Sequence, residues 1–106
     1  MVVELDVFSG RPNPRWQLDE PAALELRRLQ GRLKFGATPP PPEPPALGYR
    51  GFVWTERAGT RRAYKGFLRA AQTVWADPSF SIERFLLDRL PPEYAPLRSR
   101  IASELR

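Results

Sequence analysis

Residues 49–77 read YRGFVWTERAGTRRAYKGFLRAAQTVWAD, and one short string returns within them: YRGF at 49–52 is followed by YKGF at 64–67. Aromatic and β-branched side chains alternate with polar ones along the stretch, which is typical of strands. The segment RAGT at 57–60 is typical of a hairpin loop, and RAAQ at 69–72 suits a second turn. We therefore expect a three-stranded antiparallel meander.

The first loop determines the predicted register of this meander. Glu56 pairs with Arg61 across the hairpin. Gly51 then lies opposite Gly66, and the second turn brings Trp75 opposite the same glycine. Glycines in a strand leave backbone uncovered, and an aromatic ring lying across them can cover it. We expect the Trp75 indole to cover both glycines.

The flanking segments predict the other elements. VVELDVF at 2–8 alternates apolar with acidic residues and predicts a strand with one buried face. Asp19 suits the N-cap of a helix that ends near Lys34 or Phe35, followed by Gly36. Two further helices are expected after the meander, with stripes formed by Ile82, Phe85, Leu86 and Arg89, and by Tyr94, Leu97, Ile101 and Leu105.

These elements predict an α+β fold with a four-stranded, mainly antiparallel sheet in β-α-β-β-β-α-α order and helices packed on one face. A length of 106 residues suits a single domain, 1–106. Residues 37–48 form a proline-rich crossover inside it, because the six prolines of 39–45 exclude helix and favour polyproline II. The alternative interpretation of these prolines is a ligand for a groove that binds proline-rich peptides.

The composition excludes several kinds of chemistry. The chain has no Cys and no His, which excludes disulfides, Cys-ligated zinc and every His-based catalytic triad. The sequence therefore predicts no catalytic residue, no cofactor and no metal site. One alternative stays open: a small enzyme of lyase or isomerase type that uses tyrosines and carboxylates, with the candidates Asp6, Tyr49, Tyr64 and Asp77.

The net charge of +5 is concentrated in one stretch. Residues 49–72 carry six cations and a single acid, Glu56, whereas the segments on either side are each neutral. The cations are Arg50, Arg57, Arg61, Arg62, Lys65 and Arg69. A basic patch of this kind suits nucleic acid or another polyanion. Of the 17 cations in the chain 15 are arginine, a bias that GC-rich coding also produces.

The predicted register places cations beside aromatic rings on one face of the meander. That face carries Arg50, Phe52, Trp54, Ala63, Lys65, Phe67 and Val74. Interleaved cations and rings suit stacking and charge pairing with a peptide or a base. The alternative is a covered face whose cations are neutralised by Glu4 and Asp6 of the first strand. A shift of one residue would exchange the two faces.

The loop SGRPNPR at 9–15 is stiffened by two prolines and offers Arg11, Asn13 and Arg15 as partner-binding residues. It lacks the glycine spacing of a phosphate-binding loop. LDVFSGRPNPRW at 5–16 and GYRGF at 48–52 resemble strings in a group of small bacterial proteins whose activity is uncharacterised. The resemblance implies a bacterial origin and singles out the loop, but it implies no activity.

We expect a cytoplasmic protein, because the N-terminal residues show no signal peptide, and no membrane partner, because no stretch is apolar enough for a membrane span. The predicted function is non-catalytic binding of a protein or peptide, for example as an accessory subunit of a peptide-modifying enzyme. The predicted binding residues are Arg11, Asn13, Arg15, Arg50, Phe52, Trp54, Lys65 and Phe67. Nucleic-acid binding by residues 49–72 is the alternative, and a homodimer is also compatible with the sequence.

Overall fold

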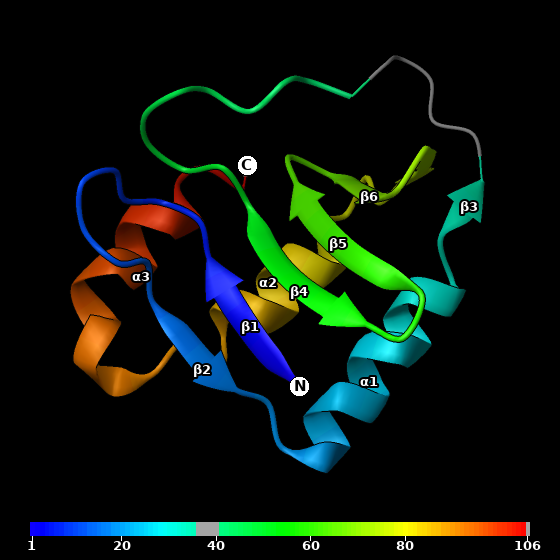
Figure 1. Ribbon diagram of the computed structural model, residues 1–106, viewed down its shortest axis with the longest axis horizontal. Helices are drawn as coiled ribbons and strands as arrows, with labels where there is room; N and C mark the ends of the chain where they lie inside the picture. The colour runs from blue at the N-terminus through cyan, green and yellow to red at the C-terminus, as the bar shows by residue number, and fades with distance from the viewer. Residues whose placement is uncertain (36–40, 106) are drawn as a thin grey trace.

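The computed structural model describes residues 1–35 and 41–105. Within them the strands form one antiparallel sheet in the order β2-β1-β4-β5-β6-β7-β3 (Figure 1). The strands are β1 (Val2–Leu5), β2 (Arg15–Gln17), β3 (Lys34–Phe35), β4 (Phe52–Glu56), β5 (Gly59–Tyr64), β6 (Phe67–Ala70) and β7 (Thr73–Ala76). The helices are α1 (Glu20–Gly31), α2 (Ser81–Leu87) and α3 (Ala95–Ala102), with a 3₁₀ turn, η1 (Pro92–Tyr94), before α3.

The predicted α+β class, the antiparallel sheet and the three helices are confirmed, but the prediction of four strands is wrong. The end of the predicted loop folds back as β2, where Trp16 pairs with Val3. The chain after α1 adds the short strand β3 at the far edge. Lys65 and Gly66, with φ of 50° and 83°, form a tight turn that divides one predicted strand into β5 and β6. Two successive residues with positive φ suit a two-residue hairpin loop.

The register of the first hairpin also differs from the prediction. Trp54, rather than Glu56, lies opposite Arg61, because the turn is formed by residues 57–58 alone. The prediction that Trp75 covers the strand glycines is wrong as well, since Trp75 lies opposite Leu68 in the next hairpin. The register shifts by two residues, and an even shift does not by itself move a residue of β4 or β5 to the other face of the sheet.

Asp19 caps α1 as predicted, and its carboxylate accepts a hydrogen bond from the Ala22 N–H at 2.9 Å. The helix ends at Gly31, earlier than predicted, because the chain leaves it to pair β3 with β7. The predicted C-terminal Gly36 lies outside the described residues. The first two residues of the predicted proline run, 39–40, also lie outside the described residues. The rest of the run, 41–45, is neither helix nor strand.

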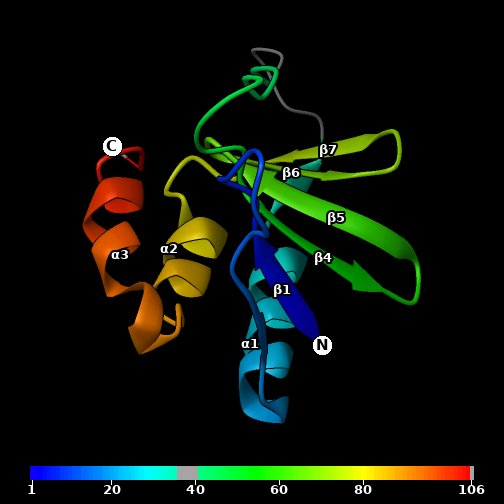
Figure 2. The ribbon, with the colours of Figure 1, turned by 60° about the vertical axis from the view of Figure 1, so that its left-hand side comes forward.

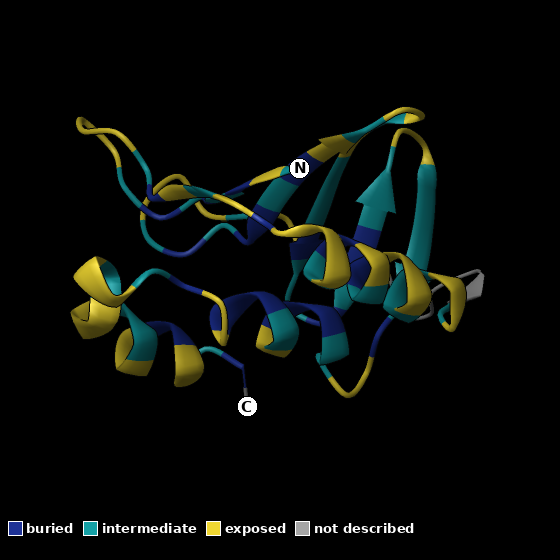
Figure 3. Ribbon diagram, turned by 90° about the horizontal axis from the view of Figure 1, so that it is seen from below, coloured by how far each residue is buried: buried dark blue, intermediate teal, exposed yellow. Residues whose placement is uncertain are grey.

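The helices lie on one face of the sheet, here called the inner face (Figure 2). Figure 3 shows buried residues gathered where the sheet and the helices meet. The fully buried side chains include Val3, Leu5, Leu26, Phe52, Trp54, Leu68, Ile82, Leu86, Ile101 and Leu105. Leu105 follows α3, so the last predicted apolar stripe does reach the core. None of the helices in the described parts of the chain is long and apolar enough to cross a bilayer.

Phe52 and Trp54 are core residues, with 0% and 2% of their surface exposed, so their predicted place on a binding surface is wrong. Gly51 explains the error. Residues two apart in a strand share a face, but Gly51 has a φ of 99° and interrupts the alternation. Arg50 therefore turns to the outer face, while the rings of Phe52 and Tyr49 meet in the core with centroids 6.1 Å apart.

Candidate functional site

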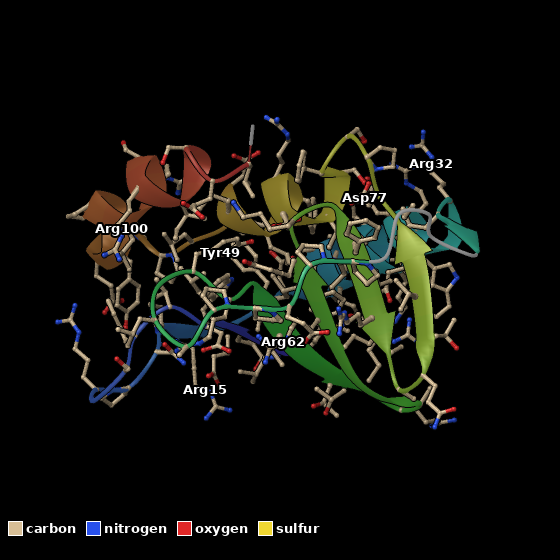
Figure 4. All side chains as sticks on the ribbon, turned by 90° about the horizontal axis from the view of Figure 1, so that it is seen from above. Arg15, Arg32, Tyr49, Arg62, Asp77 and Arg100 are labelled. Carbon is tan, nitrogen blue, oxygen red and sulfur yellow. The ribbon has the colours of Figure 1, made fainter. Side chains whose placement is uncertain are left out.

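Three of the predicted cations meet on the outer face of the sheet. Arg50 precedes β4, Arg62 lies in β5, and Arg69 lies directly opposite Arg62 in β6. They line a cleft of about 460 Å³ that is bordered by Pro44 and Pro45 of the proline-rich segment. We call these three residues and their surroundings the arginine cleft. Figure 4 shows Arg62 beside the proline-rich segment as it crosses the sheet.

Asp6 is the acidic centre of the arginine cleft. Its Oδ1 accepts a hydrogen bond from Nε of Arg50 at 2.9 Å, and its Oδ2 accepts one from Nη1 of Arg62 at 2.8 Å. Burial raises the pKa of Asp6, but the hydrogen bonds and charges of the two arginines outweigh burial and hold the pKa below its ordinary value. Asp6 is therefore ionised at neutral pH and neutralises part of the cluster, as the alternative interpretation of the face predicted.

Asn13 ties the N-terminal loop to the same network. Its Oδ1 accepts hydrogen bonds from the N–H groups of Val7 and Phe8 at 3.0 and 2.7 Å. Its Nδ2 donates to Glu4 at 2.9 Å and to Asp6 at 3.3 Å. Both ends of the amide are thus engaged, and Asn13 holds the loop in place rather than facing a partner.

The arginines differ in how much of each is available to a ligand. Arg50 also donates to the carbonyls of Phe8 and Ala46, at 2.6 and 2.8 Å, and its side chain is only 16% exposed. The side chains of Arg62 and Arg69 are 32% and 33% exposed. Arg50 therefore fastens the strand to its neighbours, and Arg62 and Arg69 form the accessible part of the cleft.

The acid that balances Arg69 comes from the proline-rich segment. Glu43 lies 3.5 Å from the Arg69 guanidinium, but its own side chain is 85% exposed. The same guanidinium donates to the carbonyls of Pro41 and Pro42 over 3.5 and 3.4 Å, which are long hydrogen bonds. An exposed ion pair of this kind is weak, so a ligand with stronger acceptors can replace Glu43.

The other predicted residues lie elsewhere. The Arg11 guanidinium stacks on the Phe8 ring, 3.7 Å from its centroid, and Arg15 of β2 lies 3.7 Å from Glu4. The Lys65 ammonium lies 3.0 Å from Glu104. Phe67 is half-buried in β6. Arg57 and Arg61 line a separate groove beside α1. The predicted basic patch is thus divided between two faces of the sheet, and most of its cations have acidic neighbours.

Sequence reasoning missed Glu83, whose side chain is 1% exposed. Its carboxylate accepts hydrogen bonds from the Tyr49 hydroxyl and from the N–H groups of Lys65 and Gly66, the latter at 3.0 and 2.7 Å. Burial raises the pKa of Glu83, and these three donors oppose the rise. Burial and the nearby Glu83 raise the pKa of Tyr49. A sequence signal existed, because Glu83 falls on the buried stripe of α2.

The residues named for a possible enzyme do not all gather at one place, although the rings of Tyr49 and Tyr64 lie together with their centroids 5.5 Å apart. Asp6 lies in the arginine cleft, whereas Tyr49 is 5% exposed and faces the core. Asp77 holds the start of α2, where it accepts hydrogen bonds from the Ile82 N–H at 2.9 Å and the Ser81 hydroxyl at 2.8 Å. In the described part of the chain no group of three or more acidic side chains is placed to hold a metal ion. Each of these residues has a structural partner that accounts for its position.

Asp6→Asn should remove an acid-sensitive contribution to stability. The pKa of Asp6 in the folded protein lies below its unfolded value of 3.8, so its contribution is complete above that pH and is lost as the pH falls through the folded pKa. We expect wild type to exceed Asp6→Asn in free energy of unfolding at about pH 7, and the gap to shrink below about pH 4. Urea unfolding followed by tryptophan fluorescence measures this gap, and a gap independent of pH would contradict the expectation.

A scan against protein-family models, a search of curated proteins and a search of solved structures each found no match for this chain. The function therefore has to be inferred from the geometry of the cleft. Its most unusual feature is the cross-strand pair of Arg62 and Arg69, with Arg50 and the carboxylates of Asp6 and Glu43 beside it.

Proposed function

We propose that this chain is a non-catalytic binding protein whose arginine cleft takes an acidic segment of a partner protein. The observation that carries the proposal is the position of Arg62 directly opposite Arg69 on neighbouring strands. Like charges at such positions destabilise a sheet. Arg62 already pairs with Asp6, whereas Arg69 pairs only with the exposed Glu43. A carboxylate bound between the two guanidiniums would replace Glu43 and form charge-assisted pairs with both arginines, and the cleft of about 460 Å³ has room for it.

The surroundings of the cleft favour a peptide over nucleic acid. A nucleic-acid backbone is bound by a series of cations that neutralise successive phosphates. Here Arg57 does not line the cleft, Arg61 borders it but directs its guanidinium to Gln30 of α1, and Lys65 is paired with Glu104. The carboxylate of Asp6 would repel further phosphates. A compact anion, such as one or two Asp or Glu side chains, suits this charge pattern better.

The proline-rich segment supplies the apolar part of the same surface. Pro44 and Pro45 border the cleft, and Pro44 is half-buried against it. Prolines form rigid surfaces that lose little conformational entropy when a peptide packs on them. We propose that the acidic side chains of the partner enter between the arginines and that its neighbouring residues lie on these prolines.

The Arg62→Ala/Arg69→Ala double variant tests this proposal with a short fluorescein-labelled polyglutamate peptide in an anisotropy titration at low salt. We expect the double variant to bind at least about tenfold more weakly than wild type, because each charge-assisted hydrogen bond contributes about 1.5–3 kcal/mol. The matched control is Arg32→Ala/Arg100→Ala, which removes the same charge at two exposed sites away from the cleft (Figure 4). Circular dichroism checks that both variants fold.

Three results would overturn the proposal. The first is no binding of polyglutamate by wild type at low salt. The second is equal weakening by the two double variants, which would show that only net charge matters. The third is tighter binding of a labelled single-stranded oligonucleotide with a steep salt dependence, which would favour the nucleic-acid alternative.

A further inference from the structure

A second concave surface lies on the inner face of the sheet, between α1 and the turn that joins β4 to β5. Its volume is about 950 Å³. Apolar side chains of Leu33, Leu68 and Trp75 line one part, and the cations Arg27, Arg57 and Arg61 line the other. We call it the hairpin groove. Arg61 also borders the arginine cleft, but the pair Arg62 and Arg69 does not line this groove.

Arg61 is incompletely satisfied in the hairpin groove. Its Nη1 donates to Oε1 of Gln30 in α1. Its Nε is shielded from solvent and has no hydrogen-bond partner among the described residues, although Oε2 of Glu56 lies 3.3 Å away. A shielded donor without an acceptor is unfavourable. An anion in the groove would give this guanidinium the acceptor that it lacks after a small turn of the side chain.

The acid of the groove is already shared among several donors. Glu56 lies 3.4 Å from Nε of Arg27 and 3.3 Å from Nε of Arg61, and it accepts a hydrogen bond from the Trp54 indole at 3.2 Å. Arg57 is exposed at the tip of the hairpin. The Glu56 carboxylate therefore interacts with two arginines and an indole, and Arg57 is a third arginine that lines the same groove. The charge of the groove favours an anionic ligand.

The apolar part and the size of the groove indicate more closely which class of ligand it would bind. Its volume falls in the range of about 300–1,000 Å³ that is typical of sites for small molecules. Trp75 and Leu33 are among the residues that line the groove, and Trp75 lies in β7, which β5 and β6 separate from Glu56 at the end of β4. We propose that the hairpin groove binds a small amphipathic carboxylate, with its apolar or aromatic body against Trp75 and its carboxylate between Arg57 and Arg61.

The indole N–H signals in a two-dimensional ¹⁵N–¹H spectrum test this proposal directly. The chain has three tryptophans, and Trp75 and Trp54 contact the groove or its acid, whereas Trp16 lies in β2 at the other edge of the sheet. The probe is 1-naphthaleneacetate. We expect the Trp75 and Trp54 signals to move in a saturable way during the titration and the Trp16 signal to stay in place.

Matched ligands and variants separate the carboxylate from the ring. 1-Naphthaleneacetamide has the same ring without the charge, and we expect it to bind at least about tenfold more weakly. Arg57→Gln, at an exposed turn, should weaken naphthaleneacetate binding several-fold, and the control Arg100→Gln should not. No saturable Trp75 shift, equal binding of the amide, or equal binding by Arg57→Gln would overturn the proposal. Groove signals that move with protein concentration alone would overturn it in favour of a second copy of the chain.

Discussion

Replacing Gly51 by alanine is expected to lower the free energy of unfolding by about 3–5 kcal/mol. The backbone at Gly51 has a φ of 99°, which costs an L-residue about 1–3 kcal/mol. A Cβ at this position would also lie 2.4 Å from the Ala63 carbonyl oxygen, which is backbone of the neighbouring strand and cannot rotate away. Both effects act directly before the start of β4, the strand that lies between β1 and β5.

Gly48→Ala is the matched control for this substitution. Gly48 has a similar φ of 89°, but a Cβ there would meet no atom within 4 Å. Its cost is that of backbone strain alone, about 1–3 kcal/mol. Urea unfolding followed by tryptophan fluorescence gives both values. Equal losses for the two variants would contradict the close approach of Gly51 to Ala63.

Glu83→Ala is expected to cost a comparable amount, about 3–5 kcal/mol. The substitution removes the carboxylate that accepts hydrogen bonds from the Tyr49 hydroxyl and from the Lys65 and Gly66 N–H groups. Only 1% of the surface of Glu83 is exposed, so water cannot readily replace this acceptor. A domain of this size is stable by about 5–15 kcal/mol, so the loss is a large part of the total. Thermal and urea unfolding measure it.

Two further variants show whether the Glu83 carboxylate acts as inferred. Glu83→Gln keeps one acceptor oxygen, so its loss should lie between those of wild type and Glu83→Ala. Glu104→Ala removes the exposed partner of Lys65 and should cost about 1 kcal/mol or less. A Glu83→Ala variant no less stable than Glu104→Ala would rule out a structural role for the buried carboxylate.

The contribution of Glu83 to the free energy of unfolding changes with pH in the opposite direction to that of Asp6. The pKa of Glu83 is raised above its ordinary value of 4.5 in the folded protein. Its contribution is therefore complete below about pH 4.5 and declines as the pH rises through the raised pKa. The difference in stability between wild type and Glu83→Gln should thus narrow from acidic to neutral pH, and urea titrations at several pH values would show this.

The sequence predicted the helices better than the sheet. Asp19 caps α1, and Ile82 and Ile101 are buried in α2 and α3, because caps and apolar periodicity are local signals. The strings YRGF and YKGF misled the strand assignment. Their repetition predicts the interior of two strands, yet each glycine has a positive φ: Gly51 directly precedes β4, and Gly66 lies in the turn between β5 and β6. Composition alone does not distinguish a strand glycine from a turn glycine.

The sequence also predicted the candidate site only in part, because local patterns do not determine how distant segments pack together. The alternation of the first strand predicts, as the alternative, that Glu4 and Asp6 neutralise the cations of this face. Asp6 does pair with Arg50 and Arg62, whereas Glu4 pairs with Arg15. The acids that approach Arg69 and Lys65, namely Glu43 and Glu104, come from segments whose docking no local pattern determines. A surplus of charge along the sequence therefore did not predict a surplus at one surface.

The position of β1 in the sheet has a consequence for how the chain assembles. β1 lies between β2, which follows it closely, and β4, which begins at Phe52 after α1 and the proline-rich crossover. The ladder between β1 and β4 closes a long loop, and such non-local pairing slows folding. During synthesis, the first strand must wait for the middle of the chain to emerge. Until then Val3 and Leu5, both fully buried in the finished protein, have no completed core to bury them.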